Sequence, residues 1–325
     1  MNFIMTIDTE GDNQWDHGWE LTVENIKFVS WFQDLCGKYY IKPTYFVTSE
    51  VCDDNFAKEI FTEYLLKDRA EIGTHLHSWT TPPFQDKDGF RYNDLNHAFA
   101  TEFPENILSE KIKNLTDQIE KSFGQRPLSF SSGRYGFNST LAKILLDNSY
   151  IVDSSVTPYT SWSVHSGMPE GKDGPDFVDK KPFPYNYNFP NGSLLEIPIT
   201  ILPTKFPLNS NSTVADYYFS NVDKSLFLKV FRKALFSKQP LWLRPLRRMD
   251  IDLFDEIINE AINTKLPYIV MMFHSSELMP GCSIYRPDKN SIEKLYDLRE
   301  CFFILLRKRN IASVTLAEAA KSCKL

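Results

Sequence analysis

The sequence predicts an α/β protein, a distorted (β/α) barrel of about seven or eight units formed by one domain that spans residues 1–325. Three observations predict this fold class. Short apolar runs alternate with amphipathic helical stretches almost from end to end, which favours a parallel sheet with crossover helices. The number of these runs is sufficient for the sheet to close into a barrel. A length of 325 residues is also usual for one elaborated α/β barrel.

The expected strands are short and apolar, and several are rich in β-branched or aromatic residues. The most apolar of them, 268–274, ends at His274. The expected strands are 3–8, 43–48, 70–75, 128–131, 150–153, 194–198, 268–274 and 312–315.

Helical stretches separate these strands, because apolar residues recur there at a spacing of three or four. Asp250 is the expected N-cap of one helix. Asn290 is the expected N-cap of the last, with Glu293 three residues later as in a capping box. The expected helices are 22–35, 55–67, 107–122, 138–147, 221–236, 250–263 and 290–309.

A Pro-rich insertion at about 157–193 interrupts the alternation. Its prolines, together with several Gly and Asn residues, are not expected to sustain regular elements. A loop of this length inside a compact chain often lines a substrate site.

Composition excludes several classes of protein. A net charge of −6 argues against a nucleic-acid binder. No apolar run approaches the roughly 18 residues of a membrane span, and the start of the chain lacks the features of a signal peptide, so we expect a cytoplasmic protein with no transmembrane segment. The five cysteines are scattered without CxxC spacing, which argues against a disulfide framework and a thiolate zinc site. The oligomeric state stays open.

One compact basic cluster, Arg244 to Arg248, follows Trp242. It has two interpretations. The cluster borders a pocket and meets an anionic group such as a sugar phosphate, or it is a solvated turn.

Two pairs of polar side chains stand at the ends of expected strands. Asp8 and Glu10 are two residues apart, as are His75 and His77, and residues with this spacing face the same side of an extended strand. Imidazole and carboxylate form a normal zinc ligand set that leaves a position for water. Of two carboxylates, one can hold a metal while the other takes a proton from water. A solvated turn explains an isolated Asp-x-Glu equally well.

His274 ends an apolar strand, and a histidine there can protonate a departing amine or alkoxide. Aromatic residues in the flanking loops offer flat faces for stacking on sugar rings. The main candidates for this stacking are Trp79 and Trp162, and Trp15, Trp19 and Tyr185 are further candidates.

These patches, in this order, resemble the motifs of the polysaccharide deacetylase superfamily, the NodB-homology or family-four carbohydrate esterase fold. Thr6-Ile-Asp-Thr-Glu-Gly is similar to the first motif, usually TFDDG, and Glu71-Ile-Gly-Thr-His to the second, usually EIGNH. The third, fourth and last motifs have similar stretches in this sequence at residues 131–136, 153–155 and 272–274. The resemblance covers nearly the whole chain. It implies a barrel of the NodB type and a divalent metal cofactor, commonly Zn²⁺.

The resemblance also implies roles for individual residues. Asp8 matches the catalytic base, His75 a metal ligand and His274 the general acid. The metal carboxylate is Glu10 or, as the alternative, Asp12. The backbone N–H of Tyr135, in the third motif, is expected to help hold the oxyanion at the substrate.

Three positions depart from the family pattern. Glu10, one residue further on, replaces the second Asp of the usual Asp pair. Trp79 stands where the second metal histidine normally lies, so His77 is its expected substitute. Ser131 occupies the place of the arginine that orients the base, which leaves Arg134 as its expected substitute. These departures fit an active branch of the superfamily and also a relative that has lost catalysis.

The function expected from the resemblance is a metal-dependent carbohydrate deacetylase, a hydrolase acting on C–N bonds other than peptide bonds. Its expected substrate is an N-acylated carbohydrate or glycolipid of cell-surface polysaccharide or glycolipid metabolism. One alternative is a hydrolase of a non-sugar amide or cyclic imide on the same fold. The other is an inactive carbohydrate-binding pseudo-deacetylase.

Overall fold

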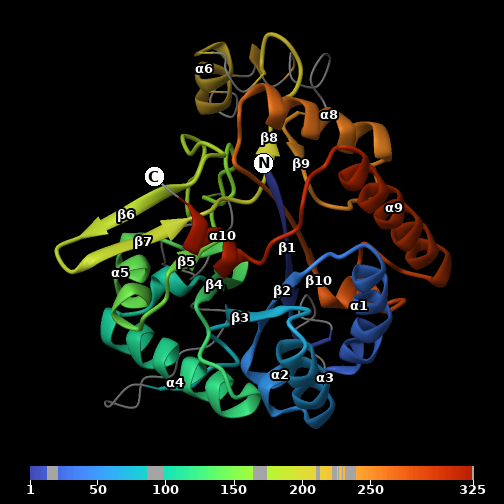
Figure 1. Cartoon of the computed structure of the whole chain (residues 1–325). Coiled ribbons are helices and arrows are strands. Elements are labelled where there is room, and N and C mark those ends of the chain that lie inside the picture. The colour runs from blue at the N-terminus through green and yellow to red at the C-terminus, as the bar shows by residue number, and fades with distance from the viewer. Residues whose placement is uncertain are drawn as a thin grey trace.

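The computed structural model has eight strands in one curled sheet with helices outside it (Figure 1). It describes residues 1–12, 21–85, 98–163, 174–209, 213–221, 225, 227, 228, 230 and 239–323. The sheet has the order β10-β1-β2-β3-β4-β5-β7-β6. Its strands are β1 (Asn2–Thr9), β2 (Pro43–Val47), β3 (Glu71–Leu76), β4 (Ser129–Ser132), β5 (Val152–Asp153), β6 (Tyr185–Phe189), β7 (Gly192–Glu196) and β10 (Tyr268–His274).

Every neighbouring pair in this sheet is parallel except β6 and β7. β1 lies between β10 and β2, in a register that places Asp8 beside His274. Because carboxyl ends of parallel strands meet at one edge of a sheet, residues far apart in the sequence come together there. The curled sheet confirms the distorted α/β barrel that the sequence predicts.

The curled sheet is not hydrogen-bonded all the way round, because β6 and β10 do not pair with each other. The chain after β7 fills part of this opening. Thr200 donates its N–H to the carbonyl of Val270 in β10 at 3.2 Å, and its Oγ1 accepts from the N–H of Val270 at 2.7 Å. A separate antiparallel pair then follows, β8 (Ile201–Leu202) and β9 (Leu241–Trp242).

The helices cover the sheet with apolar faces, and several of them begin at polar caps. In α4, residues such as Ile112, Leu115 and Ile119 are fully buried against the core. Asp250 caps α8, as expected, by accepting from the N–H of Leu253 at 2.9 Å. The described α-helices are α1 (Val29–Lys38), α2 (Ser49–Asp53), α3 (Asn55–Leu66), α4 (Glu105–Phe123), α5 (Ser139–Asp147), α6 (Thr213–Asn221), α8 (Ile251–Asn263), α9 (Lys289–Lys308) and α10 (Leu316–Ser322).

Short 3-10 segments extend or precede several of these helices. The stretch expected as one helix at 22–35 begins as η1 and continues as α1. The N-cap of α9 is Asp288, whose carboxylate accepts from the N–H of Ser291 at 2.8 Å, so the expectation of Asn290 was two residues late. The 3-10 segments are η1 (Glu24–Phe28), η2 (Ala100–Glu102), η3 (Gly133–Tyr135) and η4 (Ser275–Leu278).

The prediction that 157–193 lacks regular structure was wrong at its C-terminal end. Residues 185–189 form β6, which pairs with β7 as a hairpin that extends from the sheet (Figure 1). The expected strand at 312–315 is reduced to one bridge between Phe3 and Ser313. Residues 164–173 of the insertion, Trp15, Trp19 and most of the expected helix 221–236 lie outside the described residues.

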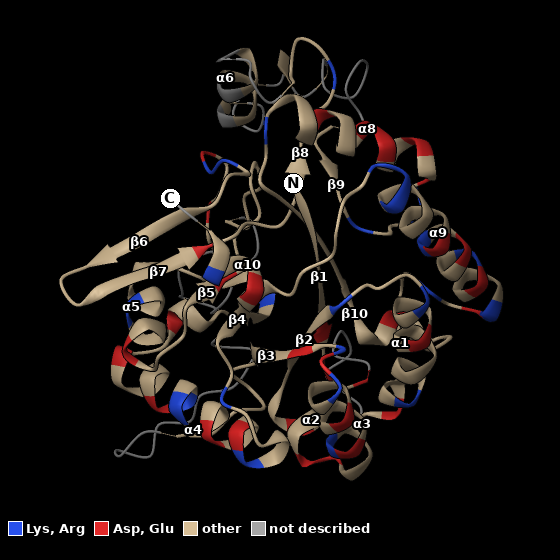
Figure 2. Cartoon of the chain, viewed as in Figure 1, with Lys and Arg blue, Asp and Glu red and all other residues tan. Residues whose placement is uncertain are grey.

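Acidic and basic residues are mixed along outer helices such as α4 and α9 (Figure 2). In the part of the chain that the structure describes, no helix combines the length and apolar character needed to cross a bilayer.

Candidate active site

Two carboxylates leave the end of β1 toward the same side. Asp8 and Glu10 are both nearly fully buried. The Oδ2 atom of Asp8 lies 3.9 Å from Nε2 of His75 and 3.9 Å from Nε2 of His274. The backbone of Glu10 is fixed on both sides, because its N–H donates to Ser275 Oγ at 3.2 Å and its carbonyl accepts from Asn25 Nδ2 at 2.9 Å. The backbone of Glu10 is therefore held in place by two distant parts of the chain.

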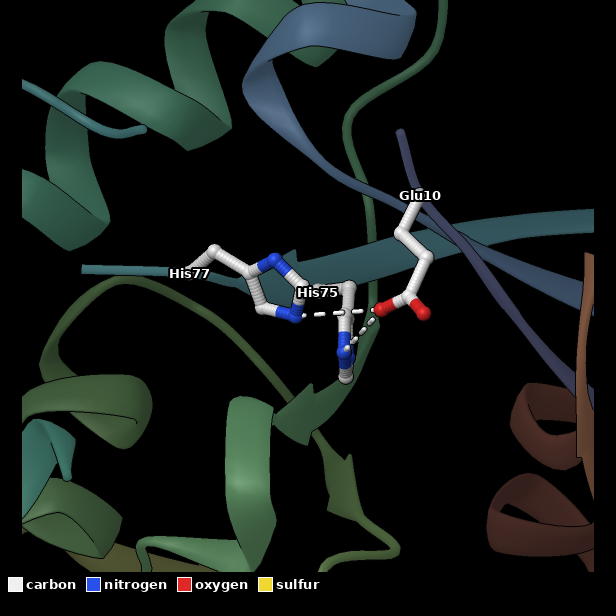
Figure 3. Close-up of side chains that lie close together, drawn as sticks. All are labelled: Glu10, His75 and His77. Atoms are coloured by element: carbon white, nitrogen blue, oxygen red, sulfur yellow. Dashed lines mark ion pairs between the residues drawn. The ribbon is translucent and has the colours of Figure 1, made fainter. Parts of the chain in front are cut away.

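Two histidines leave the end of β3 and face Glu10 (Figure 3). Nε2 of His77 lies 3.2 Å from Oε2 of Glu10, and Nε2 of His75 lies 3.8 Å from the same oxygen. Nδ1 of His75 lies 3.0 Å from the carbonyl oxygen of Ser131. A carbonyl only accepts, so Nδ1 carries the proton and the Nε2 lone pair of His75 points into the site.

These three side chains fit a divalent cation. One ligand atom each from Glu10, His75 and His77 lies within 4.8 Å of the others. Oε1 of Glu10 and Nδ1 of His77 are buried and have no hydrogen-bond partner among the described residues. Burial opposes the ionisation of Glu10, but the nearby imidazoles hold its pKa below the usual value, and burial lowers the pKa of His75. An ionised carboxylate and neutral imidazoles are the forms that bind Zn²⁺.

Asp12 is engaged elsewhere. Its carboxylate accepts from the backbone N–H groups of Glu24 and Asn25 at 2.7 and 2.9 Å, and from Thr22 Oγ1 at 2.8 Å. It thus satisfies the first N–H groups of η1. Of the two carboxylates that the sequence left open as metal ligands, the structure places only Glu10 with the histidines.

His274, which lies beside Asp8, belongs to a buried network of hydrogen bonds. Nδ1 of His274 lies 3.0 Å from Nη2 of Arg244 and 3.4 Å from Oε1 of Glu277. Arg244 also donates to Glu277 at 3.1 Å. These two partners suit the two protonation states of the imidazole. Neutral Nδ1 accepts from the guanidinium, whereas protonated Nδ1 donates to the carboxylate.

The pKa values in this network shift in opposite directions. Burial disfavours the imidazolium, but the charge of Glu10 and the hydrogen bond with Glu277 raise the pKa of His274 above its usual value. Burial also disfavours the Glu277 carboxylate, but the hydrogen bond with His274 and the charge of Arg244 lower its pKa to about 2. The network therefore favours a protonated His274 beside an ionised Glu277.

Asp8, Glu10 and the three histidines form the floor of a pocket of about 440 Å³. Its walls are aromatic. Tyr135 stacks on Trp162 with ring centroids 4.8 Å apart, and Trp79 stacks on His77 at 4.4 Å. Trp242 meets Trp162 edge to face at 6.4 Å. The remaining wall residues are Phe99, Ser132, Arg134, Arg244, Leu246, Arg248 and Tyr285.

The amino-acid sequence matches no protein-family model and no curated protein. Among solved structures, a protein assigned as a polysaccharide deacetylase from Mycobacterium smegmatis aligns over 97% of this chain and 93% of its own, with a TM-score of 0.50 and 13% identity. The chain has the polysaccharide deacetylase fold. Puue allantoinase aligns over 98% of this chain and 88% of its own, with a TM-score of 0.50 and 14% identity. A 4-alpha-glucanotransferase from Thermococcus litoralis aligns over 100% of this chain but 39% of its own, with a TM-score of 0.53 and 12% identity.

The polysaccharide deacetylase fold brings the site residues expected from the sequence into one pocket. Arg134 lies in its wall, with its guanidinium 5.5 Å from the ring centre of Phe99. Among the hydrogen bonds and ion pairs of the described residues, none joins Arg134 to Asp8, so the contact expected to orient the base is not formed. The residues expected in the site that line the pocket are Asp8, Glu10, His75, His77, Trp79, Arg134, Tyr135, Trp162 and His274.

The sequence did not predict that Glu277, Phe99 and Tyr285 belong to the site of this polysaccharide deacetylase fold. The signal for Glu277 was its position three residues after His274, since η4 turns it back toward the imidazole. Of the two interpretations of the basic cluster, the structure supports the one that places it beside a pocket, because Arg244 and Arg248 line that pocket. Nothing in the local sequence marks Phe99, which reaches the pocket from the segment before η2.

Proposed function

We propose that the chain is a metal-dependent hydrolase that removes an acyl group, most simply N-acetyl, from a nitrogen of a sugar. The proposed setting is cell-surface polysaccharide or glycolipid metabolism. One observation carries this proposal. Glu10, His75 and His77 converge on one point, and Asp8 and His274 face each other beside it in the same pocket. A ligand triad next to an acid–base pair is what hydrolysis of an amide requires.

Glu10, His75 and His77 would hold the divalent cation, which we propose to be Zn²⁺. When bound, such a cation lowers the pKa of water and polarises a carbonyl oxygen. Asp8 accepts the proton of the attacking water at Oδ2. His274 then gives the proton on Nε2 to the leaving nitrogen, as the hydrogen bond with Glu277 keeps the ring oriented. The aromatic walls stack on the sugar ring and exclude bulk water.

A second candidate is hydrolysis of a cyclic amide or ureide. The observation that favours it is the TM-score of 0.50 with Puue allantoinase, which equals the score with the Mycobacterium smegmatis protein. The acid–base pair and the cation would serve either substrate. The difference lies in the pocket walls, where broad aromatic faces such as Trp162 and Trp242 favour a sugar ring.

The test combines metal content with turnover in matched variants. Purified protein reloaded with zinc should hold about one ion per chain and release acetate from an N-acetylated sugar. Asp8→Asn should keep the ion and lose roughly 10²- to 10⁴-fold in rate, because only the proton acceptor is removed. Glu10→Gln should lose both the activity and the bound ion. The two variants are matched, because each replaces one carboxylate by an amide.

Three results would redirect the proposal. Release of product from allantoin but not from N-acetylated sugars would favour the ureide hydrolase. Zinc bound without turnover of either class would favour a carbohydrate-binding protein that has lost catalysis. No ion in the reloaded wild-type protein would reject the metal-dependent mechanism.

A further inference from the structure

Two arginines in the pocket wall have no acidic partner among the described residues. Arg134 and Arg248 both line the pocket, and both side chains are exposed. Neither takes part in the ion pairs that the described residues form. The neighbouring arginines are engaged by the protein: Arg244 with Glu277 at 3.1 Å, and Arg247 with the carbonyl oxygens of Ile284 and Tyr285 at 2.9 and 3.1 Å. Within the basic cluster 244–248, Arg248 therefore differs from the other two arginines.

The backbone presents Arg134 to the pocket at a cost. Arg134 and Tyr135 follow each other with φ of 54° and 61°, the left-handed region that side chains other than Gly rarely adopt. Ser132 Oγ holds this turn by donating to the carbonyl of Gly136 at 2.8 Å. The result places the guanidinium over the face of Phe99 and the Tyr135 ring against Trp162. A strained turn that carries two pocket residues is typical of a ligand-binding site.

The charge of the pocket is divided. The acidic lining residues, Asp8 and Glu10, lie on the floor among the three histidines. The wall carries guanidinium groups, which donate paired hydrogen bonds to phosphate or carboxylate oxygens. Two such groups match the charge of about −1.5 to −2 on a phosphate monoester at pH 7. The protein as a whole has a net charge of −6, so this positive wall is a local property.

We propose that Arg134 and Arg248 form a phosphate subsite, and that the acylated sugar hydrolysed by this protein carries a phosphate group. This inference rests on the proposed function for the identity of the sugar. The phosphate itself comes from one of two sources. It is a free monoester on the sugar, or it is a diester that links the sugar to a lipid or nucleotide.

The test is binding, measured by calorimetry on chelator-treated protein so that neither hydrolysis nor a bound metal contributes. The probes are N-acetylglucosamine, its 1-phosphate, UDP-N-acetylglucosamine and N-acetylmuramic acid. The phosphorylated sugars should bind at least about tenfold more tightly than the neutral sugar, since each charge-assisted contact contributes about that factor. Tighter binding of the 1-phosphate would assign the phosphate to a free monoester. Tighter binding of UDP-N-acetylglucosamine would assign it to a link between the sugar and a lipid or nucleotide.

Matched variants locate the subsite. Arg134→Met and Arg248→Met keep the aliphatic length, and each should lose about tenfold in phosphate preference while affinity for the neutral sugar stays unchanged. The control is Arg126→Met, because Arg126 pairs with Glu120 at 2.9 Å on the surface outside the pocket lining. It should behave as wild type. Circular dichroism checks that each variant is folded.

Several outcomes would overturn the subsite. One is that the wild-type protein binds neutral and phosphorylated sugars equally tightly. Another is that the preference for phosphate survives in the Arg134→Met, Arg248→Met double variant. The third is that N-acetylmuramic acid, which carries a carboxylate in place of the phosphate, binds as tightly as the phosphorylated sugars. Because the chelated protein is used, a failure here is distinct from a failure of the hydrolase proposal, which is tested by metal content and acetate release. A phosphate preference without turnover would support the subsite alone.

Discussion

At the scale of single residues, the sequence predicted which side chains share a face but not which of them are used elsewhere. A spacing of two correctly placed Glu10 beside Asp8 and His77 beside His75, because both pairs leave extended backbone. The family resemblance left Asp12 as the less favoured alternative to Glu10. Only the path of the chain after Thr22, which brings backbone N–H groups of η1 to Asp12, makes that carboxylate a cap. Such a contact depends on a loop, so no local pattern contains it.

Gly133 gives a prediction at this scale, because it lies against a proposed metal ligand. A Cβ on Gly133 would meet Cδ2 of His77 and the carbonyl oxygen of Leu76, both at 2.6 Å. Gly133→Ala should therefore displace the His77 ring and weaken zinc binding by roughly 10- to 100-fold. The measurement is zinc affinity by competition with a chromophoric chelator.

The control for this variant is Gly37→Ala in α1, where a Cβ meets only the flexible Arg69 side chain, at 3.4 Å. It should leave the zinc affinity unchanged and stabilise α1 slightly. Equal zinc affinity in Gly133→Ala and wild type would mean that His77 does not bind the ion.

At the scale of elements, helices and parallel strands were predictable, and the exceptions have physical reasons. Amphipathic helices such as α4 carry their own signal, since their buried residues recur every three or four positions. β6 was missed because Pro184 and Pro190 flank it closely. Its alternation of aromatic residues with Asn186 and Asn188 was the available sign of a strand with one covered face. Its pairing with β7 supplies the rest.

Lys111 of α4 gives a prediction about the loop that follows β3. Its buried Nζ donates to the carbonyl oxygens of Ser78, Thr81 and Pro83 at 2.9, 2.6 and 2.6 Å. Burial lowers its pKa to about 8. Lys111→Met leaves these carbonyls without their donor and should lower the free energy of unfolding by about 3 kcal/mol, measured in urea.

The same variant should speed hydrogen exchange of the amides of Thr80 and Thr81, which bond to the carbonyl of His77. Lys113→Met is the control on the same helix, because Lys113 is exposed and its one ion pair within the described part of the chain is with Asp117, at 2.6 Å. It should change stability by less than about 0.5 kcal/mol. Similar effects of the two variants would mean that Lys111 does not hold the loop.

At the scale of the whole molecule, the predicted barrel follows from alternation alone, because parallel strands joined by helices must lie side by side with their carboxyl ends together. That rule brings Asp8 and His274 to one place from opposite ends of the chain. The rule does not say where the barrel opens. The barrel opens where Thr200, in place of a full strand, pairs with β10. The sequence does not mark this place, because the preceding stretch 194–198 resembles any other short strand.

The stability of the whole molecule should depend on pH through Glu277. This carboxyl is fully buried, and its pKa falls from 4.5 to about 2 because the hydrogen bond with His274 and the charge of Arg244 outweigh burial. A pKa lowered by folding stabilises the protein above the unfolded value of 4.5, and this contribution is lost as the pH falls toward 2. It is on the order of 3 kcal/mol at neutral pH.

Glu277→Gln removes this contribution and leaves Arg244 buried without its carboxylate. Relative to wild type, the variant should unfold at a lower urea concentration at pH 7, and the gap should narrow as the pH falls from 4.5 toward 2. Glu63→Gln is the control, since Glu63 of α3 is exposed and pairs with Lys67, the residue that follows the helix. A gap that stays constant over this range would show that the ionisation of Glu277 does not couple to folding, and that the variant acts through packing alone.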